Sequence, residues 1–242
     1  MLLEAQGVSR NFGAFRALDG ADLGVEDGEL VGLIGPNGAG KSTFFNCIAG
    51  DLLPSAGRVR FAGRDVTRAP PELHARLGIG RTFQVPATFE DMSVLENVMV
   101  GAFLRHPGRA AAIAAAREVI ERVGLAEQRD APARSLGTPG RKRLEIARVL
   151  ATAPRLLLLD EALAGLNPTE IGRAIELVRQ IHQSGVTIVI VEHIMEVILS
   201  LAQRVVVFDH GRIIAAGRPA EVVEEPAVIE AYLGHSLKRR AP

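Results

Sequence analysis

The sequence predicts an α/β fold on a parallel sheet, and three observations support this prediction. Apolar runs of strand length alternate with helical segments, and the clearest of these runs are residues 30–34, 156–160 and 187–191. Strand-like segments at 2–12 and 17–25, followed by a short one at 58–61, predict a small antiparallel β subdomain. Residues 86–150 have helical character, so we expect a helical subdomain inserted into the α/β core.

The length and composition fit one domain without a strong charge bias. The chain has 242 residues, and we expect a single domain over 1–242 whose core combines 1–85 with 151–242. Lys+Arg and Asp+Glu both total 28, so the formal net charge is zero, which argues against nucleic acid as a partner. The single cysteine, Cys47, excludes an intrachain disulfide and is typical of a reducing compartment. We expect it to be a small buried apolar residue.

Neither a signal peptide nor a membrane span is expected. Residues 1–4 lack the charged and then apolar layout of a secretory signal. The best apolar stretch, 197–208, is interrupted by Gln203 and Arg204 and is too short to cross a bilayer. We therefore expect that any work at a membrane is done from the cytoplasmic side through a partner.

A phosphate-binding loop is predicted at residues 35–43, which read G-P-N-G-A-G-K-S-T between a buried strand and the start of a helix. Glycines let the backbone wrap closely around phosphate oxygens, and the helix that begins near Lys41 adds its positive dipole end. Lys41 supplies a mobile charge for the β- and γ-phosphates, and Ser42 a hydroxyl ligand for Mg²⁺. The expected nucleotide-binding residues are Asn37, Gly38, Ala39, Gly40, Lys41, Ser42 and Thr43. The alternative, a glycine-rich turn that happens to carry a lysine, does not account for the flanking strand and helix.

The other elements follow from local signals. Turn residues Asn11 and Gly13 separate the first two strands, and a polar joint that ends at Pro86 follows Arg81. Ser93 and Glu96 form a capping-box pattern that predicts a helix through residue 102. The remaining helices are expected at 109–123, 144–150, 170–183, 219–225 and 227–233, and a further strand at 205–209.

Polar side chains stand where strands end or join other elements. Asp160 ends a buried strand, where a carboxylate is costly unless it holds a cation, and Mg²⁺ fits that position. Glu161 follows directly and is placed to accept a proton from an attacking water. Gln84 could orient that water or contact the metal. His193 follows the strand 187–191, so we expect it at the same sheet edge as Asp160.

Each of these residues also has a simpler interpretation. An Asp-Glu pair is a common polar strand end, and an isolated glutamine such as Gln84 is usually a surface amide. A lone histidine is usually structural, and His193 has no second His or Cys at metal-ligand spacing. Phe12 could stack on a nucleotide base or equally be a core phenylalanine.

In this order, the motifs resemble those of the ATP-binding-cassette (ABC) ATPases, the motor subunits of membrane transporters, over essentially the whole chain. The matching segments are 35–43 for the Walker A loop, Gln84 for the Q-loop, 156–160 with Glu161 for Walker B and the catalytic base, 164–168 with Asn167 for the D-loop, and His193 for the switch histidine. Phe12 falls where the family often has an aromatic residue under the adenine. The resemblance implies a phosphate-loop NTPase core, ATP hydrolysis with Mg²⁺, and two subunits arranged head to tail around two ATP molecules.

A finer resemblance is to the branched-chain amino-acid uptake ATPases. The similar segments are 80–84, 144–148, 164–168 and 229–234. This resemblance implies an importer subunit that works with transmembrane permease subunits and, indirectly, with a solute-binding protein. It also implies a peripheral position on the cytoplasmic face of the membrane, beside a second ATPase subunit in a homodimer or a heterodimer.

The chain departs from the family at the signature segment, Leu-Ser-Gly-Gly-Gln, which falls on residues 136–140. Gly137 replaces the serine, Thr138 the first glycine, Pro139 the second glycine and Gly140 the glutamine. The serine hydroxyl is therefore absent, and Pro139 lacks a backbone N–H. Ala162 also replaces the proline that usually follows the catalytic glutamate. These changes put the contacts to a partner's γ-phosphate in doubt, while the chain's own phosphate loop is unaffected.

Four other functions compete with this interpretation. An ABC protein acting on ribosomes usually carries two cassettes, and one acting on DNA needs a long coiled-coil insertion; this sequence has neither. A regulatory ATP-binding subunit that completes a partner's catalytic site remains open because of residues 136–140. A phosphate-loop kinase is disfavoured, because a carboxylate at position 161 favours water as the nucleophile.

Overall fold

The structure, a computed structural model, describes residues 1–83 and 87–238. Its internal contacts divide the chain into two units. The first unit consists of Met1–His74 and Thr187–Pro242, and the second of Ala75–Val186.

The first unit contains the small antiparallel sheet that the sequence predicts. Its strand order is β2 (Phe15–Val25), β1 (Leu3–Phe12), β4 (Ala56–Phe61) and β5 (Arg64–Asp65). Leu3 on the central strand pairs with Val25 on one side and with Phe61 on the other. Because side chains alternate between the faces of a strand, Leu3 and Ala5 are buried, and Val8 is buried after a register shift between Ala5 and Val8. The expected antiparallel β subdomain is confirmed.

A second sheet carries the phosphate loop. Within this unit its order is β10 (Arg212–Gly217), β9 (Arg204–Asp209), β3 (Leu30–Ile34) and β8 (Thr187–Val191). Strand β3 runs parallel to both neighbours, with Leu33 opposite Val191 and Val206. Every residue of β3 and β8 is buried, as expected for strands covered on both faces. The carboxyl ends of β3, β8 and β9 therefore lie at one edge of the sheet.

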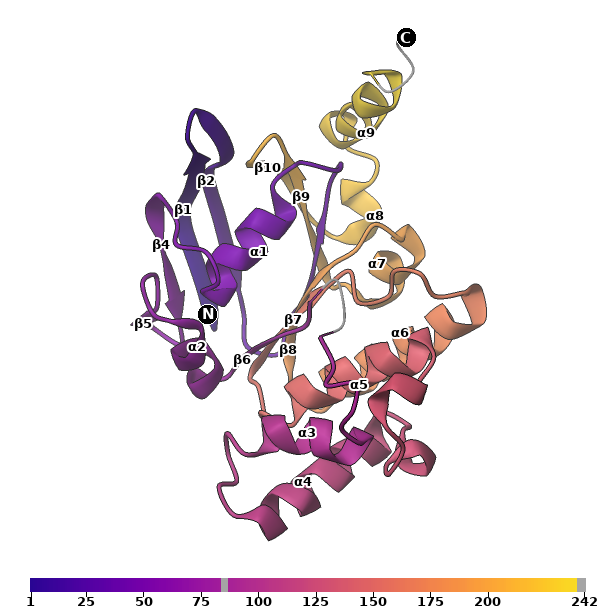
Figure 1. Ribbon diagram of the computed structural model, residues 1–242. Helices are drawn as coiled ribbons and strands as arrows, with labels where there is room; N and C mark the ends of the chain where they lie inside the picture. The colour runs from indigo at the N-terminus through magenta and orange to yellow at the C-terminus, as the bar shows by residue number, and fades with distance from the viewer. Residues whose placement is uncertain (84–86, 239–242) are drawn as a thin grey trace. The chain divides into compact units, whose positions relative to one another are not determined.

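Helices surround these strands (Figure 1). They are α1 (Lys41–Ala49), α2 (Pro71–Leu77), α7 (Met195–Leu201), α8 (Pro219–Val222) and α9 (Pro226–Lys238). Phe44 on α1 packs on Phe208 of β9, with ring centroids 5.2 Å apart. Cys47 on the same helix is buried, as expected, and burial raises the pKa of its thiol to about 11, so it stays protonated at neutral pH.

The second unit combines a parallel strand pair with most of the helices of the inserted segment. Strand β6 (Ile79–Arg81) pairs with β7 (Leu156–Asp160), with Arg81 opposite Leu158. Between them in the chain come α3 (Val94–Ala102), α4 (Arg109–Arg122) and α5 (Thr138–Leu150), with two short 3₁₀ helices, Ala126–Gln128 and Ala133–Ser135. Helix α6 (Pro168–Gln183) follows β7. The predicted fold class, an α/β core with an inserted helical segment, is confirmed.

The observed start of α3 agrees with the sequence prediction, whereas the start of α5 differs from it. Ser93 and Glu96 make the predicted capping box, with the Glu96 N–H donating to the Ser93 hydroxyl at 3.1 Å. Helix α5 begins at Thr138, six residues before the expected start at 144, because Pro139 in its first turn is suited to a helix N-terminus. Within the two described stretches, no helix combines the length and the apolar character that crossing a bilayer requires.

Candidate functional site

The phosphate loop of the first unit has a backbone that only glycine allows at two positions. Gly35 has φ 142° and Gly40 has φ 104°, in the region that L side chains rarely adopt. A Cβ on Gly35 would lie 2.1 Å from the carbonyl oxygen of Phe208, and one on Gly40 would lie 2.7 Å from that of Ala17. The loop is therefore held tightly against β9 and β2, and its exposed residues, Asn37 and Gly38, face solvent.

Lys41 is the first residue of α1, and its ammonium is held inside the loop. Its Nζ donates hydrogen bonds to the carbonyl oxygens of Gly35 at 2.6 Å and Pro36 at 2.9 Å. The side chain is buried, whereas Ser42 is exposed and Thr43 is half-buried. A buried ammonium beside a helix N-terminus concentrates positive potential, which suits the triphosphate of a nucleotide.

The C-terminal helix reaches the same loop. A hydrogen bond with the Gly35 backbone lowers the pKa of the Tyr232 phenol on α9, but burial raises that pKa by more. Sequence reasoning did not single out Tyr232, because nothing in the local pattern of α9 indicates a partner almost two hundred residues earlier in the chain.

Two further predicted residues of this unit are exposed. His193 lies two residues after the end of β8, and because Leu33 pairs with Val191, it stands at the same sheet edge as the phosphate loop. Phe12 ends β1 with 47% of its surface exposed, and the Arg10 guanidinium carbon lies 4.8 Å from its ring centroid. Phe12 is therefore not a core residue, and its ring is available for stacking.

In the second unit, Asp160 ends β7 in a buried position. Its carboxylate accepts a hydrogen bond of 2.9 Å from Arg81 at the end of β6, forming an ion pair of which both members are largely shielded from solvent. Its backbone N–H also donates to the Thr82 hydroxyl at 3.2 Å. Sequence reasoning missed Arg81 as part of this site, because the pairing depends on two strands that are far apart in the chain.

Glu161 follows Asp160 in a left-handed backbone conformation, with φ 47°. Such a conformation is uncommon for a residue with a side chain and is found disproportionately at functional sites. Its carbonyl oxygen accepts from the Ala164 N–H at 3.1 Å and from Lys142 Nζ at 3.4 Å. These contacts fix the backbone of Glu161, and the backbone conformation in turn sets the direction of its half-buried side chain.

The signature segment forms the N-terminal end of α5. Gly137 is the N-cap residue and provides no side-chain capping bond, and Pro139 occupies the first turn. Gly137 and Thr138 are exposed, Pro139 is half-buried and Gly140 is buried. A Cβ on Gly140 would lie 3.1 Å from Leu136 Cβ, so this glycine allows a close approach of Leu136. The segment has the helix-start geometry of an anion site, but it lacks one N–H and a serine hydroxyl.

Asn167 has a structural role in addition to any functional one. It is the N-cap of α6, and its side chain accepts from the Glu170 N–H at 3.0 Å while Glu170 accepts from the Asn167 N–H at 2.9 Å. Gln84, the remaining predicted site residue, lies outside the described residues. Its neighbour Phe83 is half exposed, and the Phe83 N–H donates to the buried carboxylate of Glu145 at 2.7 Å.

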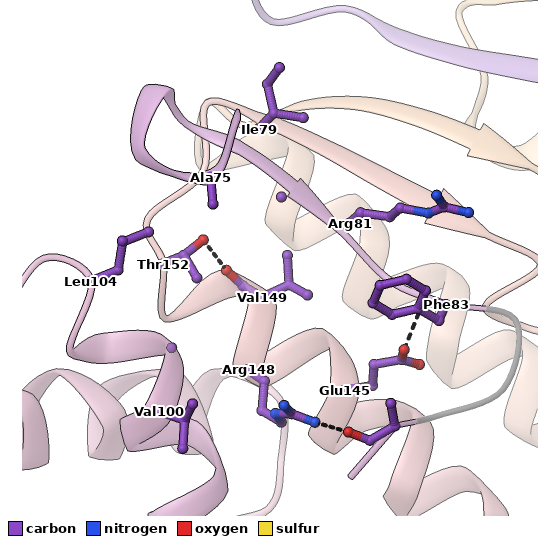
Figure 2. A pocket seen from close by; sticks show the side chains of 13 residues that line it. Ala75, Ile79, Arg81, Phe83, Val100, Leu104, Glu145, Arg148, Val149 and Thr152 are labelled. Carbon is purple, nitrogen blue, oxygen red and sulfur yellow. Dashed lines mark hydrogen bonds between the residues drawn. The ribbon is translucent and has the colours of Figure 1, made fainter. Parts of the chain in front are cut away.

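A pocket of about 370 Å³ lies beside α3 and α5 in the second unit, and we call it the α3 pocket (Figure 2). It is lined by Ala75, Ile79, Gly80, Arg81, Phe83, Ala87, Val100, Gly101, Leu104, Glu145, Arg148, Val149 and Thr152. Phe83 and Val100 in its wall are large exposed apolar residues. Arg148 donates to the carbonyl of Ala87, and Glu145 accepts from Phe83, so the polar groups of the wall are held in place.

The structure thus brings the predicted residues together in two groups. The first unit joins the phosphate loop, Lys41, Ser42 and His193 at one sheet edge. The second unit joins Asp160 and Glu161 at the end of β7, beside Arg81. Sequence reasoning also missed Glu145, because a charged residue on an amphipathic helix ordinarily faces solvent.

Comparison with known proteins identifies relatives over almost the whole chain. The sequence model of the ABC transporter family matches residues 18–164, and the model described as branched-chain amino acid ATP-binding cassette transporter matches residues 212–237. The chain is 36% identical to the high-affinity branched-chain amino acid transport ATP-binding protein BraF of Pseudomonas aeruginosa, covering 97% of this chain and 98% of the relative. It is 34% identical to a probable branched-chain amino acid transport ATP-binding protein of Archaeoglobus fulgidus, covering 96% and 95%.

Solved structures agree with these sequence relatives. A nucleotide-free ATP-binding cassette from an ABC transporter superposes with a TM-score of 0.87 at 32% identity, covering 96% of this chain and 98% of the other. The ADP conformation of an ABC transporter cassette superposes equally well, with the same TM-score, identity and coverage.

Proposed function

Because the chain belongs to the ABC transporter family, we propose that it is the ATP-hydrolysing subunit of a transporter that imports branched-chain amino acids or similar small solutes. The observation that carries the proposal is similarity along 97% of the chain to a protein named for branched-chain amino acid transport. The separate match of residues 212–237 to a branched-chain transporter model supports the same solute class.

The first unit supplies the nucleotide-binding residues of the proposal. Residues 37–43 surround the phosphates, with backbone N–H groups and the N-terminus of α1 directed at them. The Lys41 ammonium, held by two loop carbonyls, exchanges those contacts for the β- and γ-phosphate oxygens. The exposed ring of Phe12 stacks on the adenine.

The donors on the two units fit Mg²⁺ as the accompanying metal. Mg²⁺ binds through one or two carboxylates together with substrate phosphates. The Ser42 hydroxyl in the first unit and the Asp160 carboxylate in the second are each an oxygen donor of the kind that Mg²⁺ takes, and we propose both as ligands. No cluster of three or more His, Cys, Asp or Glu residues that could hold a metal occurs in the part of the chain that the structure describes. When bound, Mg²⁺ neutralises phosphate charge; Gln84 is its third proposed contact.

The chemistry proposed for this chain is attack of water on the γ-phosphate. Glu161 takes the proton of the attacking water, and its fixed backbone turn presents the carboxylate for that role. Gln84 and His193 contact the γ-phosphate and the water, and they respond to the presence of the third phosphate. Asn167 contributes from the D-loop, where capping of α6 fixes its position.

The proposed assembly contains two ATPase subunits and transmembrane permease subunits at the cytoplasmic face of the membrane, with a solute-binding protein contacting the permease. We assign the α3 pocket to the permease, because it is a hollow with exposed apolar residues and ordered polar groups in its wall. The second ATPase subunit contributes its signature segment to this chain's ATP.

One observation favours a second candidate, a regulatory subunit that completes a partner's site. Pro139 in the first turn of α5 removes an N–H, and Gly137 offers no hydroxyl. Each lost charge-assisted contact costs about 1.5–3 kcal/mol. In a heterodimer, this chain's own phosphate loop would therefore serve the faster site, and its signature segment the slower one.

The proposal is tested by tagging the chain in its native membrane and identifying the proteins that co-purify. We expect two permease subunits and a second ATPase, and the reconstituted complex should couple ATP hydrolysis to uptake of leucine, isoleucine or valine. ATP-driven uptake of an unrelated solute would overturn the solute assignment. Absence of membrane partners would overturn the transport function itself.

A further inference from the structure

Arg81 occupies a position between the end of β7 and the α3 pocket. Its guanidinium donates to the Asp160 carboxylate at 2.9 Å, and the side chains of Arg81 and Asp160 are only 12% and 6% exposed. A buried ion pair is sensitive to any change in either partner, because an uncompensated charge away from water is costly. The carboxylate of Asp160 thus depends on where Arg81 lies.

The other side of Arg81 belongs to the α3 pocket (Figure 2). Its guanidinium carbon lies 5.2 Å from the ring centroid of Phe83, and both residues line the pocket. Phe83 is 48% exposed and lines the pocket, so a molecule in the pocket would contact it directly. The Phe83 backbone is anchored by its bond to Glu145, which leaves the ring as the movable part.

We propose that Arg81 is a positioning residue that couples occupancy of the α3 pocket to the carboxylate of Asp160. The inference rests on the proposed function, in which Asp160 serves the metal and the permease fills the pocket. A guanidinium on the carboxylate fixes its orientation and lowers its attraction for a second cation. A partner that presses on Phe83 moves the guanidinium, and the cation affinity of Asp160 changes with it.

The two contacts call for arginine in particular. Its planar guanidinium can place an N–H on a carboxylate while the face of the group lies on an aromatic ring. A lysine at this position could keep the positive charge near Asp160. Its compact ammonium, however, has no planar face that can stack on the Phe83 ring. Arg81→Lys therefore separates the charge of the residue from its coupling role.

The first test titrates Mn²⁺, as a paramagnetic substitute for Mg²⁺, into the purified chain with a non-hydrolysable ATP analogue and counts free Mn²⁺ by electron paramagnetic resonance. For Arg81→Met we expect Mn²⁺ affinity to rise by about threefold or more, because an opposite charge beside a carboxylate alters cation binding by roughly tenfold. For Arg81→Lys we expect an affinity within about twofold of the parent chain, since the charge is retained.

The second test repeats the titration on the complex co-purified with its permease. For the parent we expect the Mn²⁺ affinity of the complex to differ from that of the free chain by about threefold or more. A change of this size corresponds to a modest coupling free energy between the α3 pocket and the metal site. Arg81→Lys and Phe83→Leu should abolish this difference. If Arg81→Met fails to fold in a thermal melt, the comparison of Arg81→Lys with the parent decides the question.

Asp160→Asn separates failure of the inference from failure of the metal site. If Asp160→Asn leaves Mn²⁺ affinity unchanged, Asp160 is not a metal ligand, and the coupling proposal falls with that assignment. If Asp160→Asn weakens binding while both Arg81 variants match the parent in the free chain and in the complex, the metal site stands and the coupling through Arg81 is wrong.

Discussion

The backbone N–H of Phe83 donates a hydrogen bond of 2.7 Å to the carboxylate of Glu145, which is 5% exposed. This bond joins the end of the segment that precedes Gln84 to α5, the helix that begins at the signature segment. A buried carboxylate therefore secures the residue next to a proposed γ-phosphate contact. The ionisation of that carboxylate has a measurable effect on stability.

Glu145 should make the chain's stability depend on pH. Burial raises its pKa above the ordinary value of 4.5, although the Phe83 N–H and the charges of Lys142 and Arg148 oppose the rise. The folded chain thus holds this proton more tightly than the unfolded chain, so the carboxyl favours folding at low pH and costs stability as pH rises above 4.5 and through its folded pKa. We predict that the gain in unfolding free energy from Glu145→Gln grows between about pH 4 and pH 8.

Urea unfolding at a series of pH values measures this difference. The matched control is Glu176→Gln, which makes the same chemical change at an exposed position of α6. A constant difference for Glu145→Gln would show that burial does not perturb this carboxyl.

Lys41→Ala should abolish tight ATP binding while the fold persists. The change leaves negative phosphate charge without its nearest cation, and a lost charge-assisted hydrogen bond corresponds to roughly tenfold or more in affinity. Binding of a fluorescent ATP analogue and a thermal melt check both statements. Lys41→Met, which keeps the stem and removes the ammonium, should behave like the alanine variant. Normal hydrolysis by either variant with an unchanged melt would contradict the phosphate-loop assignment.

Glu161→Gln should bind ATP and retain it. The amide keeps the shape of the carboxylate but accepts no proton, so turnover should fall by ~10²-fold or more. Because ATP stays bound, closed pairs of subunits should accumulate, which size-exclusion chromatography with ATP detects. The control is Glu170→Gln, since glutamine can replace glutamate in the capping box of α6. Near-parental turnover for Glu161→Gln would remove Glu161 from the role of base.

The double change Gly137→Ser with Pro139→Gly tests the signature segment. It restores a hydroxyl and an N–H at the start of α5, and each regained contact corresponds to about tenfold or more in rate at the site it serves. We predict a clear rise in ATPase activity of the reconstituted transporter. An unchanged or lower rate, from a parent already fast as a homodimer, would mean that residues 136–140 are a working variant.

The elements that sequence predicted best are those with a complete local signal. Residues 30–34 and 156–159 are uninterrupted apolar runs, and both lie in fully buried strands. Strand β6 was not predicted, because it has three residues, includes a glycine, and exists through its pairing with β7 far along the chain. A short strand of this kind has no periodicity to detect, and tertiary pairing decides its conformation.

The same distinction applies to the functional site: residues in a continuous motif were predicted, and partners from distant segments were not. The phosphate loop carries its chemistry in consecutive residues, so the sequence shows both the residues and the backbone that glycine permits. The partners Arg81 for Asp160 and Glu145 for Phe83 are set by long-range packing, with 79 and 62 positions separating the two members of each pair. No single-sequence pattern relates such residues. Their contribution emerges only once strands and helices are placed within the unit.

The hydrogen bond between the Gly35 backbone and the Tyr232 hydroxyl has a practical consequence for anyone who labels or immobilises this protein. A fusion domain, fluorophore or surface attachment at the C-terminal end acts on α9, and through Tyr232 on the first residue of the phosphate loop. A label at Met1 acts instead on the exposed ion pair between the terminal amine and Glu26, at a distance of 2.7 Å, in a different part of the unit. Nucleotide affinities measured with C-terminal tags should therefore be compared with those from N-terminally tagged or untagged protein before they are assigned to the loop.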